Sequence, residues 1–274
     1  MKKALTNKKI GFIGAGNMAE ALISGLITSK QVRPDQIFIS DIDSQRRNLL
    51  EKRYGVKPVA ESATLCKDSN ILILAVKPQQ VEKALEEAKK SISSENLLIS
   101  IAAGITTQKL ATLTESKPKI VRAMPNIAAL QRQGITALFL GHRSGEKEKE
   151  ASEAIFNAVG KTVQIELEEL MDAVTALSGS GPAYFFHLAE LMVEGGIELG
   201  LHVKTATELV LQTLQGAATL ARNANVSLAK LREQVTSPGG TTEAALKIFE
   251  SRDLRSIMKE ALLRAYQRGK EISK

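Results

Sequence analysis

The chain has 274 residues, a formal net charge of +7 and a sequence pI near 9.4, with 43% hydrophobic and 24% charged residues. These values exclude an intrinsically disordered or fibrous protein and leave room for one large or two modest globular domains. The basic charge raises nucleic acid as a partner. Only 4% of the residues are aromatic and none is Trp, however, so the sequence lacks the stacking surface of a single-strand binder. We therefore expect no nucleic-acid partner.

The cysteine and histidine content excludes two further classes of site. A single cysteine, Cys66, rules out an internal disulfide, and its apolar context predicts a small buried residue. Three scattered histidines predict no metal site. The N-terminal lysines are not followed by the apolar run of a signal peptide, and the most apolar stretches, 71–76 and 97–105, are too short to cross a bilayer. We expect a cytoplasmic protein with no membrane partner.

The first half of the chain alternates short apolar runs with amphipathic stretches. The apolar runs predict strands at 9–14, 37–41, 71–76, 97–104 and 119–126, with further candidates at 135–140 and 162–165. Helical spacing of apolar residues predicts helices at 17–29, 44–53, 81–92 and 146–158. Strands separated by helices indicate right-handed βαβ units, and hence a mostly parallel, doubly wound α/β sheet.

The second half changes to long amphipathic helices, expected at 183–200, 204–224, 242–249 and 253–271. The change of hydrophobic period predicts a domain boundary near 161–168, with one domain at 1–165 and an all-α domain at 166–274. Glycines and a proline in LSGSGPAY (177–184) predict a break between two helices. Small residues within the long helices indicate close helix packing and an interface to bury.

A glycine motif lies at the end of the first predicted strand, in the sequence GFIGAGNMAEAL. Its pattern is Gly14-x-Gly16-x-x-Ala19, in which Gly14 allows a tight turn, Gly16 admits a pyrophosphate and Ala19 permits close packing of helix on strand. The motif follows a strand and opens an amphipathic helix, whose N-terminal amides favour an anion. The sequence therefore predicts a dinucleotide site.

The residues after the second strand bear on the choice between NAD and NADP. Asp41 stands where an acid reads the ribose 2′-hydroxyl of NAD. Arg46 and Arg47 follow and could pair with the 2′-phosphate of NADP, although each could equally be a solvated residue on a helix. Ser40 could hydrogen-bond either form. These residues alone leave the choice open.

Two further strand ends are placed to line the same cofactor. AVKP (75–78) follows the third strand, where the backbone of Val76 and Lys77 could border the dinucleotide and Pro78 stiffens the turn. Taken alone, Lys77 would be an ordinary surface lysine at a helix start. Residues 102–104 are small and could lie against a flat nicotinamide.

A second anion-binding candidate is TSPGGTTEAAL (236–246), which places glycines directly before a helix. Free amides near Gly240, Thr241 and Thr242 could bind a carboxylate at the helix N-terminus. Composition alone favours an ordinary interhelical loop with a threonine cap.

The motifs GFIGAGNMAEAL, AVKPQ, SIAAGI, RAMPN, LSGSGPAY and VTSPGGTT occur in this order, and together the sequence resembles the Δ1-pyrroline-5-carboxylate reductases over residues 8–271. LSGSGPAY with SPGGTT is the specific part of the resemblance. It implies an N-terminal Rossmann domain and a C-terminal helical domain that forms a homodimer, with dimers commonly assembled into decamers. The implied cofactor is NADPH, with NADH also used by some members. The implied substrate is a cyclic imino acid.

The resemblance also assigns residues. Cofactor contacts fall on Ile13, Gly14, Ala15, Gly16, Asn17, Met18, Ser40, Val76, Lys77 and Ala102. Asp41, Arg46, Ser62 and Pro78 complete the expected cofactor set. Ser62 replaces an asparagine that members often place on the adenosine ribose, and Asp41 replaces a small or polar residue, which weakens a preference for NADP. Substrate contacts fall on Glu168, on the amides from Gly240 to Thr241, and on the amide and hydroxyl of Thr242.

The resemblance implies reduction of Δ1-pyrroline-5-carboxylate to L-proline by hydride transfer from NAD(P)H, the last step of proline biosynthesis. Thr242 is the expected catalytic residue, through a hydrogen bond to the ring nitrogen. One alternative is another two-domain reductase such as a 3-hydroxy-acid dehydrogenase, but neither Lys204 nor Lys230 stands in the glycine-rich setting of that class's catalytic lysine. A nucleotide sensor without catalysis is a second alternative, although it would have no need of a second anion site.

Overall fold

The computed structural model describes residues 4–273, and its contacts divide the chain into two compact units. Unit 1 takes in the chain up to Ser180 together with the segment from Ala265 onward, and unit 2 is Gly181–Arg264. The boundary expected at 165 follows the last strand. In the structure, unit 1 continues past residue 165 to Ser180. Met171 contributes to this extension, because it is buried in one hydrophobic cluster with Met124 and Ala137 of the sheet.

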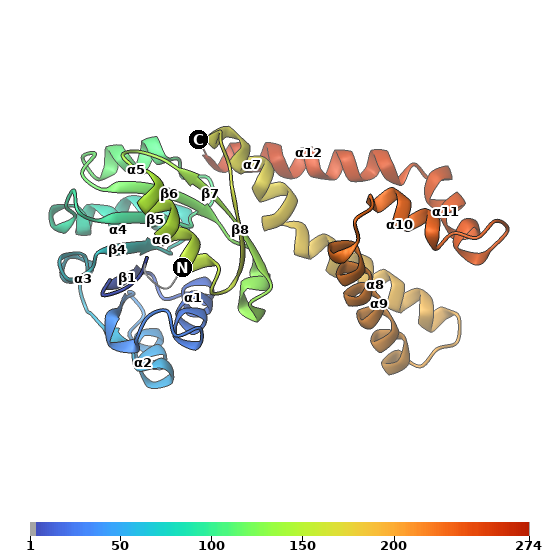
Figure 1. Ribbon diagram of the computed structural model, residues 1–274, viewed down its shortest axis with the longest axis horizontal. Coiled ribbons are helices and arrows are strands. Elements are labelled where there is room, and N and C mark those ends of the chain that lie inside the picture. Colours follow the sequence, from blue (N-terminus) through green and yellow to red (C-terminus); the bar gives the residue numbers. More distant parts are fainter. Residues whose placement is uncertain (1–3, 274) are drawn as a thin grey trace. The chain divides into compact units, whose positions relative to one another are not determined.

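Unit 1 is built on one eight-stranded sheet with the order β3-β2-β1-β4-β5-β6-β7-β8 (Figure 1). The strands are β1 (Ile10–Ile13), β2 (Ile37–Ser40), β3 (Lys57–Pro58), β4 (Ile71–Leu74), β5 (Leu97–Ser100), β6 (Lys119–Met124), β7 (Gly134–Leu140) and β8 (Gly160–Gln164). All pairs are parallel except β6 with β7. The predicted α/β class and mostly parallel sheet are confirmed.

The register brings four strand ends to one edge of the sheet. Ile13 pairs with Ser40 and with Leu74, and Leu74 pairs with Ser100. Each strand therefore ends at the same level, and the loops that follow all leave from this edge. In open α/β sheets this carboxyl edge is where ligands bind.

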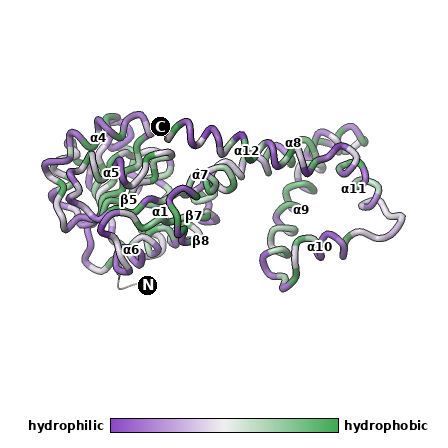
Figure 2. Tube along the Cα trace, turned by 90° about the horizontal axis from the view of Figure 1, so that it is seen from above, coloured by the Kyte–Doolittle hydropathy of each residue, from purple (hydrophilic) through white to green (hydrophobic). Residues whose placement is uncertain are grey.

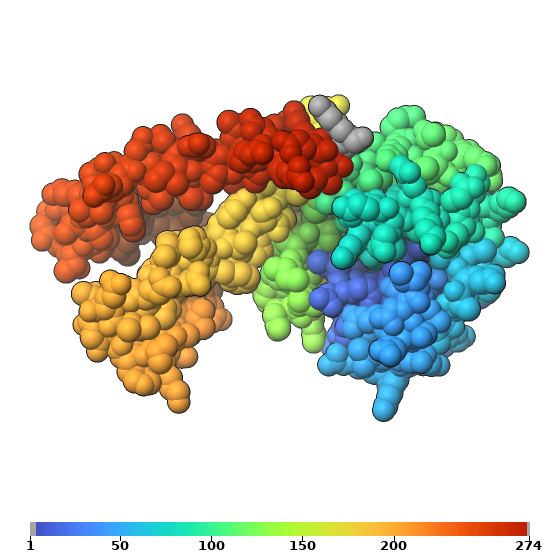
Figure 3. Space-filling view, turned by 180° about the vertical axis from the view of Figure 1, so that it is seen from behind, coloured from blue at the N-terminus to red at the C-terminus, as the bar shows by residue number. Residues whose placement is uncertain are grey.

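Helices cover both faces of the sheet, as a doubly wound fold requires. They are α1 (Asn17–Thr28), α2 (Ser44–Tyr54), α3 (Ser62–Asp68), α4 (Val81–Ala88), α5 (Thr107–Leu113), α6 (Glu146–Phe156) and the short α7 (Met171–Val174). Buried residues of α1, α2 and α6 form one core with one face of the strands, and those of α3, α4 and α5 form a second core with the other face. In the space-filling view the residues from β1 to β8, blue to green, form one continuous body (Figure 3).

The single cysteine, Cys66, lies in α3 within the second core and is buried, as expected. Burial raises the pKa of the Cys66 thiol to about 12. Because the thiolate is the reactive form, it is scarce at neutral or mildly alkaline pH. We expect the native protein at pH 8 to react with a thiol reagent at least about 100-fold more slowly than the protein unfolded in urea. Equal rates in the two states would contradict the burial of this thiol.

Unit 2 consists of helices. They are α8 (Gly181–Glu198), α9 (Val203–Asn223), α10 (Leu228–Gln234), α11 (Thr241–Ser251) and the start of α12 (Leu254–Ser273), which ends in unit 1. The interruption between helices that was predicted over LSGSGPAY (177–184) is limited to Ser180 in the structure. Residues 175–179 form a π-helical turn, and α8 begins at Gly181. Pro182 fits there because the first turn of a helix needs no amide donor.

Much of the apolar surface of unit 2 is exposed. Among the described residues of this unit, the buried hydrophobic side chains are limited to Ala206 and Val210. Hydrophobic stretches run along α8 and α9 (Figure 2). They include Phe185 and Phe186, which are 58% and 65% exposed. Among the helices formed by residues 4–273, none combines the length and apolar character needed to cross a membrane.

Candidate active site

The turn after β1 has the geometry of a pyrophosphate-binding loop. Gly14 has a positive φ of 98°, and a Cβ placed there would lie 2.6 Å from the Ala75 carbonyl oxygen. Gly16 is the N-cap of α1 and has an ordinary φ of −66°. Apart from Gly16 itself and its two neighbours in the chain, no described atom lies within 4 Å of a Cβ built on Gly16, and within residues 4–273 no side chain caps α1. The open space and the helix amides beside it fit a dinucleotide phosphate.

The two glycines therefore have separable roles, which substitution can test. Gly16→Ala is expected to weaken dinucleotide binding by about 10-fold, because its methyl group enters the space left for the phosphates. Its thermal midpoint should change little, since alanine adopts the observed φ without strain. Gly14→Ala is the matched contrast: it should lower the thermal midpoint, because both the positive φ and the close carbonyl oppose a Cβ. Titration of nicotinamide fluorescence and thermal unfolding check both. Tight binding by Gly16→Ala would contradict the proposed path of the phosphates.

The remaining expected cofactor residues gather at the same sheet edge. The Gly14 amide donates to the Ser40 carbonyl at 2.7 Å, and the Ala75 amide donates to the Ile13 carbonyl at 2.8 Å. The backbone hydrogen bonds between neighbouring strands therefore continue for one residue beyond the strand ends. Val76 is partly buried, Lys77 is exposed, and Pro78 begins a 3₁₀ turn. Ala102 is buried and its amide donates to Ser100 Oγ at 3.3 Å. Ile13, Ala15, Asn17 and Met18 belong to β1, to the loop after it and to α1.

The end of β2 adds a polar group of side chains. Ser40 Oγ lies 3.1 Å from Ser62 Oγ, at the first residue of α3. Asp41 Oδ2 accepts from the Ala15 amide at 2.7 Å. Arg46, expected as a cofactor contact, donates through Nε to the Ala15 carbonyl and forms an ion pair with Glu20. These contacts bind the loop after β1 to the residues that follow β2.

The Glu20 carboxylate is the centre of that group. Burial raises its pKa, but hydrogen bonds from Arg46, Tyr54 and Arg53 outweigh this and hold the pKa below its ordinary value. Arg53 Nη1 is 2.7 Å and Tyr54 Oη 3.0 Å from Glu20 Oε1. Glu20 therefore stays ionised at neutral pH and neutralises the charge of Arg46.

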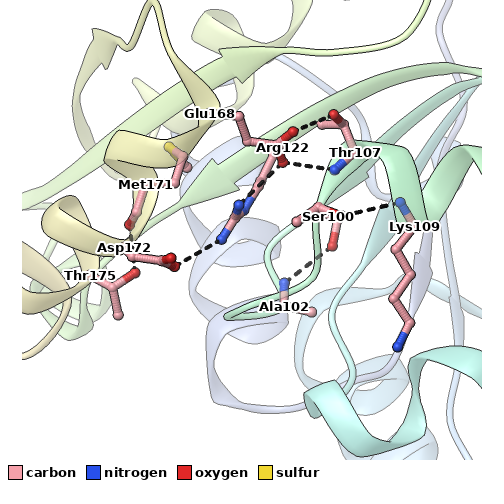
Figure 4. A network of polar contacts seen from close by, with 10 residues as sticks. Ser100, Ala102, Thr107, Lys109, Arg122, Glu168, Met171, Asp172 and Thr175 are labelled. Carbon is pink, nitrogen blue, oxygen red and sulfur yellow. Dashed lines mark hydrogen bonds and ion pairs between the residues drawn. The ribbon is translucent and has the colours of Figure 1, made fainter. Parts of the chain in front are cut away.

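Glu168, expected as a substrate contact, lies in unit 1 and belongs to a partly buried network (Figure 4). Its two carboxylate oxygens accept from the Thr107 amide at 2.7 Å and from Thr107 Oγ1 at 2.6 Å. Arg122 Nη1 is 3.2 Å from Glu168 Oε1, and Nη2 is 3.6 Å from Asp172 Oδ1. The Arg122 side chain is 3% exposed. The network joins α5, β6 and the segment that enters α7.

Sequence reasoning missed Thr107, Arg122 and Asp172. The available signal was an arginine within the apolar run KIVRAM, because a charge in a buried strand requires an opposite charge.

The other expected substrate residues lie in unit 2, at the start of α11. Gly240 is the N-cap, with φ −82° and ψ 171°, and no side chain of the described chain caps this helix. Gly239 has a φ of 71°, and its amide donates to Glu243 Oε2 at 2.7 Å. The amides of Thr241 and Thr242 are thus among those that an α-helix leaves without an internal partner. Such amides can bind a carboxylate.

Comparison with known proteins identifies two matching family models. Residues 168–272 match a model described as pyrroline-5-carboxylate reductase dimerisation, and residues 9–104 match one described as NADP oxidoreductase coenzyme F420-dependent. A pyrroline-5-carboxylate reductase of Methanosarcina acetivorans is 39% identical over 98% of this chain and 100% of its own length.

Solved structures agree with this result. A pyrroline-5-carboxylate reductase from Coxiella burnetii superposes with a TM-score of 0.91 at 38% identity, covering 97% of this chain and 99% of its own. The Plasmodium falciparum pyrroline carboxylate reductase, determined with NADP bound, gives a TM-score of 0.88 at 28% identity, covering 98% and 99%.

Proposed function

The chain belongs to the pyrroline-5-carboxylate reductase family, and from this premise we propose how its residues carry out the reaction. It is an NAD(P)H-dependent oxidoreductase that reduces Δ1-pyrroline-5-carboxylate to L-proline, as in proline biosynthesis. The observation that carries the proposal is the phosphate-binding turn at Gly14 and Gly16, on a chain whose relatives match it from end to end.

The chemistry divides between cofactor and protein. When bound, the dihydronicotinamide supplies the hydride that reduces the imine carbon. The α1 amides hold the pyrophosphate, and the small residues 102–104 leave room for the flat ring at the end of β5. Orientation is the main contribution expected of the protein, because a protonated imine is already electrophilic.

Substrate binding is proposed for the start of α11. The amides of Gly240, Thr241 and Thr242 bind the carboxylate, and the Thr242 hydroxyl hydrogen-bonds the ring nitrogen. Because the cofactor residues belong to unit 1 and these residues to unit 2, the reaction requires both units. Residues 166–180 and the segment from Ala265 onward belong to unit 1, so the domain bounds of 1–165 and 166–274 stay a prediction.

Glu168 takes a different part in this proposal. Both of its carboxylate oxygens already accept hydrogen bonds from Thr107, and Arg122 pairs with one of them. A carboxylate would also repel the carboxylate of the substrate. We therefore propose that Glu168 supports the site by fixing α5 and β6 beside the loop after β5.

The family model supports a homo-oligomer. We propose a homodimer formed through the helices of unit 2, where most of the exposed large apolar side chains occur. Assembly into decamers and a cytoplasmic location remain predictions. Sedimentation equilibrium would test the first, and a stable, fully active monomer would contradict the dimer.

Steady-state kinetics test the activity. The purified chain should oxidise NADH or NADPH when Δ1-pyrroline-5-carboxylate is present, followed by nicotinamide absorbance. A 3-hydroxy acid with NAD⁺ or NADP⁺ is the control, because it is the substrate of the alternative class. Turnover of the hydroxy acid without turnover of the imine would reject the proposal.

A further inference from the structure

The polar group at the end of β2 carries an inference that rests on the proposed function and goes beyond it. We propose that Asp41 and Asp43 make this chain bind NADH more tightly than NADPH. A 2′-phosphate would need hydrogen-bond donors at the end of β2, and this chain's own carboxylates take them.

Backbone donors around the end of β2 and the start of α2 are occupied by carboxylates of the chain. Asp41 Oδ2 accepts from the Ala15 amide at 2.7 Å, and its Oδ1 accepts from the Asp43 amide at 2.9 Å. Asp43 Oδ1 accepts from the Gln45 amide at 2.9 Å and from the Arg46 amide at 3.2 Å. The N-terminus of α2, which would otherwise suit a phosphate, is thus capped by a charge of the same sign as the phosphate.

Arg46, the arginine expected as a cofactor contact, is also engaged. Arg46 binds the Ala15 carbonyl and pairs with Glu20, and the two side chains are 21% and 14% exposed. Arg47 donates through Nη1 to the Asp41 carbonyl, which places a second guanidinium beside the acid. The carboxylates of Asp41 and Asp43 belong to the same short segment of the chain.

The charges in this group balance. Glu20, Asp41 and Asp43 are opposed by the guanidinium groups of Arg46, Arg47 and Arg53. A neutral group offers a 2′-phosphate, with its charge near −2, no net attraction, and the residue that stands where the ribose is read, Asp41, is an acid. A 2′-hydroxyl, by contrast, can donate a hydrogen bond to Asp41, because each carboxylate oxygen accepts more than one.

Direct binding tests this on the full chain without substrate. NADH and NADPH are titrated by nicotinamide fluorescence, and AMP and adenosine 2′,5′-bisphosphate compete as probes of the ribose end. We expect NADH to bind about 10-fold more tightly than NADPH, and AMP to compete better than the bisphosphate. The ratio should shrink as salt is raised, because salt screens the repulsion.

Two charge-removing variants are expected to change the ratio. Asp41→Asn keeps the size of the side chain and removes its charge, so NADPH should bind about 10-fold more tightly. Asp43→Asn keeps a good N-cap and removes the second charge, so it tests repulsion without disturbing α2. Asp35→Asn is the matched control: it changes the net charge equally at the opposite end of β2 and should leave the ratio unchanged.

The outcomes are distinct. Tighter binding of NADPH by the unaltered chain, or an unchanged ratio in both Asp41→Asn and Asp43→Asn, would overturn the inference while leaving the proposed reductase intact. Failure of every nicotinamide dinucleotide to bind would overturn both.

Discussion

Thr242→Ala is expected to lower kcat for Δ1-pyrroline-5-carboxylate by about 10- to 100-fold, the value of one hydrogen bond to a charged group. The lost hydroxyl is the one proposed to bind the ring nitrogen. Binding of NAD(P)H should stay near normal, because Thr242 lies in unit 2 and the cofactor residues lie in unit 1. Initial rates at saturating imine and a separate cofactor titration measure the two effects.

Thr242→Ser is the control for this variant, since it keeps a hydroxyl and should retain most of the turnover. Alanine is a stronger helix former than threonine, so the fold of α11 should survive the change. Unchanged kinetics in Thr242→Ala would remove Thr242 from the mechanism. Equal losses in the alanine and serine variants would assign the effect to packing rather than to the hydroxyl.

Arg122→Met is expected to destabilise the protein by about 3–5 kcal/mol, because it removes the buried guanidinium that pairs with the partly buried carboxylates of Glu168 and Asp172. Methionine fills most of the same volume, so loss of charge and not a cavity is the main effect. Urea unfolding followed by circular dichroism measures the free energy.

The matched control is Arg33→Met. Arg33 pairs with Asp35 on the surface, where the side chains are 69% and 57% exposed, so the loss should be at most about 1 kcal/mol. The double variant Arg122→Met with Glu168→Gln should recover part of the loss, since it removes one unpaired charge and keeps a carbonyl for Thr107. A loss below 1 kcal/mol in Arg122→Met would contradict the energetic role of the network.

Local sequence patterns predicted the elements that are long or strongly apolar. β4 is four consecutive buried apolar residues, and its run ILILAV was predicted as a strand that is apolar on both faces. β3 was missed because it is only Lys57–Pro58, half exposed and without an apolar run. The seven-residue helices α3, α5 and α10 were missed because each is short. For α5 and α10 the caps, Thr106 and Ser227, were the available signal, since each accepts a hydrogen bond from the amide three residues further along.

The antiparallel direction of β7 could also have been predicted from the sequence. Residues 125–133, between β6 and β7, hold only a short 3₁₀ turn. A parallel crossover needs a dozen or more residues, so β7 must run antiparallel to β6. The step from β7 to β8 passes through α6 and is parallel, as that rule requires.

The residues of the candidate site also fall into those that local sequence patterns predicted and those that they did not. Gly14, Gly16 and Asp41 follow from local patterns, because strand ends and glycine spacing are read from a few neighbouring residues. The pairing of Arg122 with Glu168 could not be predicted from a local pattern, because the two residues are 46 positions apart in the chain. The engagement of Arg46 by Glu20 was equally hidden, although both residues lie in elements that were predicted.

Unit 1 is not continuous along the chain, because the segment from Ala265 returns to it after the whole of unit 2. This segment is the C-terminal part of α12, and it lies beside α7: a Cβ built on Gly269 would be 3.6 Å from Asp172 Cβ. Closing a loop of that size carries an entropic penalty, but the penalty grows slowly, by about 0.6 kcal/mol for each doubling of length. Contacts between such distant segments form late in folding. The segment from Ala265 onward is therefore expected to join unit 1 after the sheet has formed, so the surroundings of Asp172 are completed last.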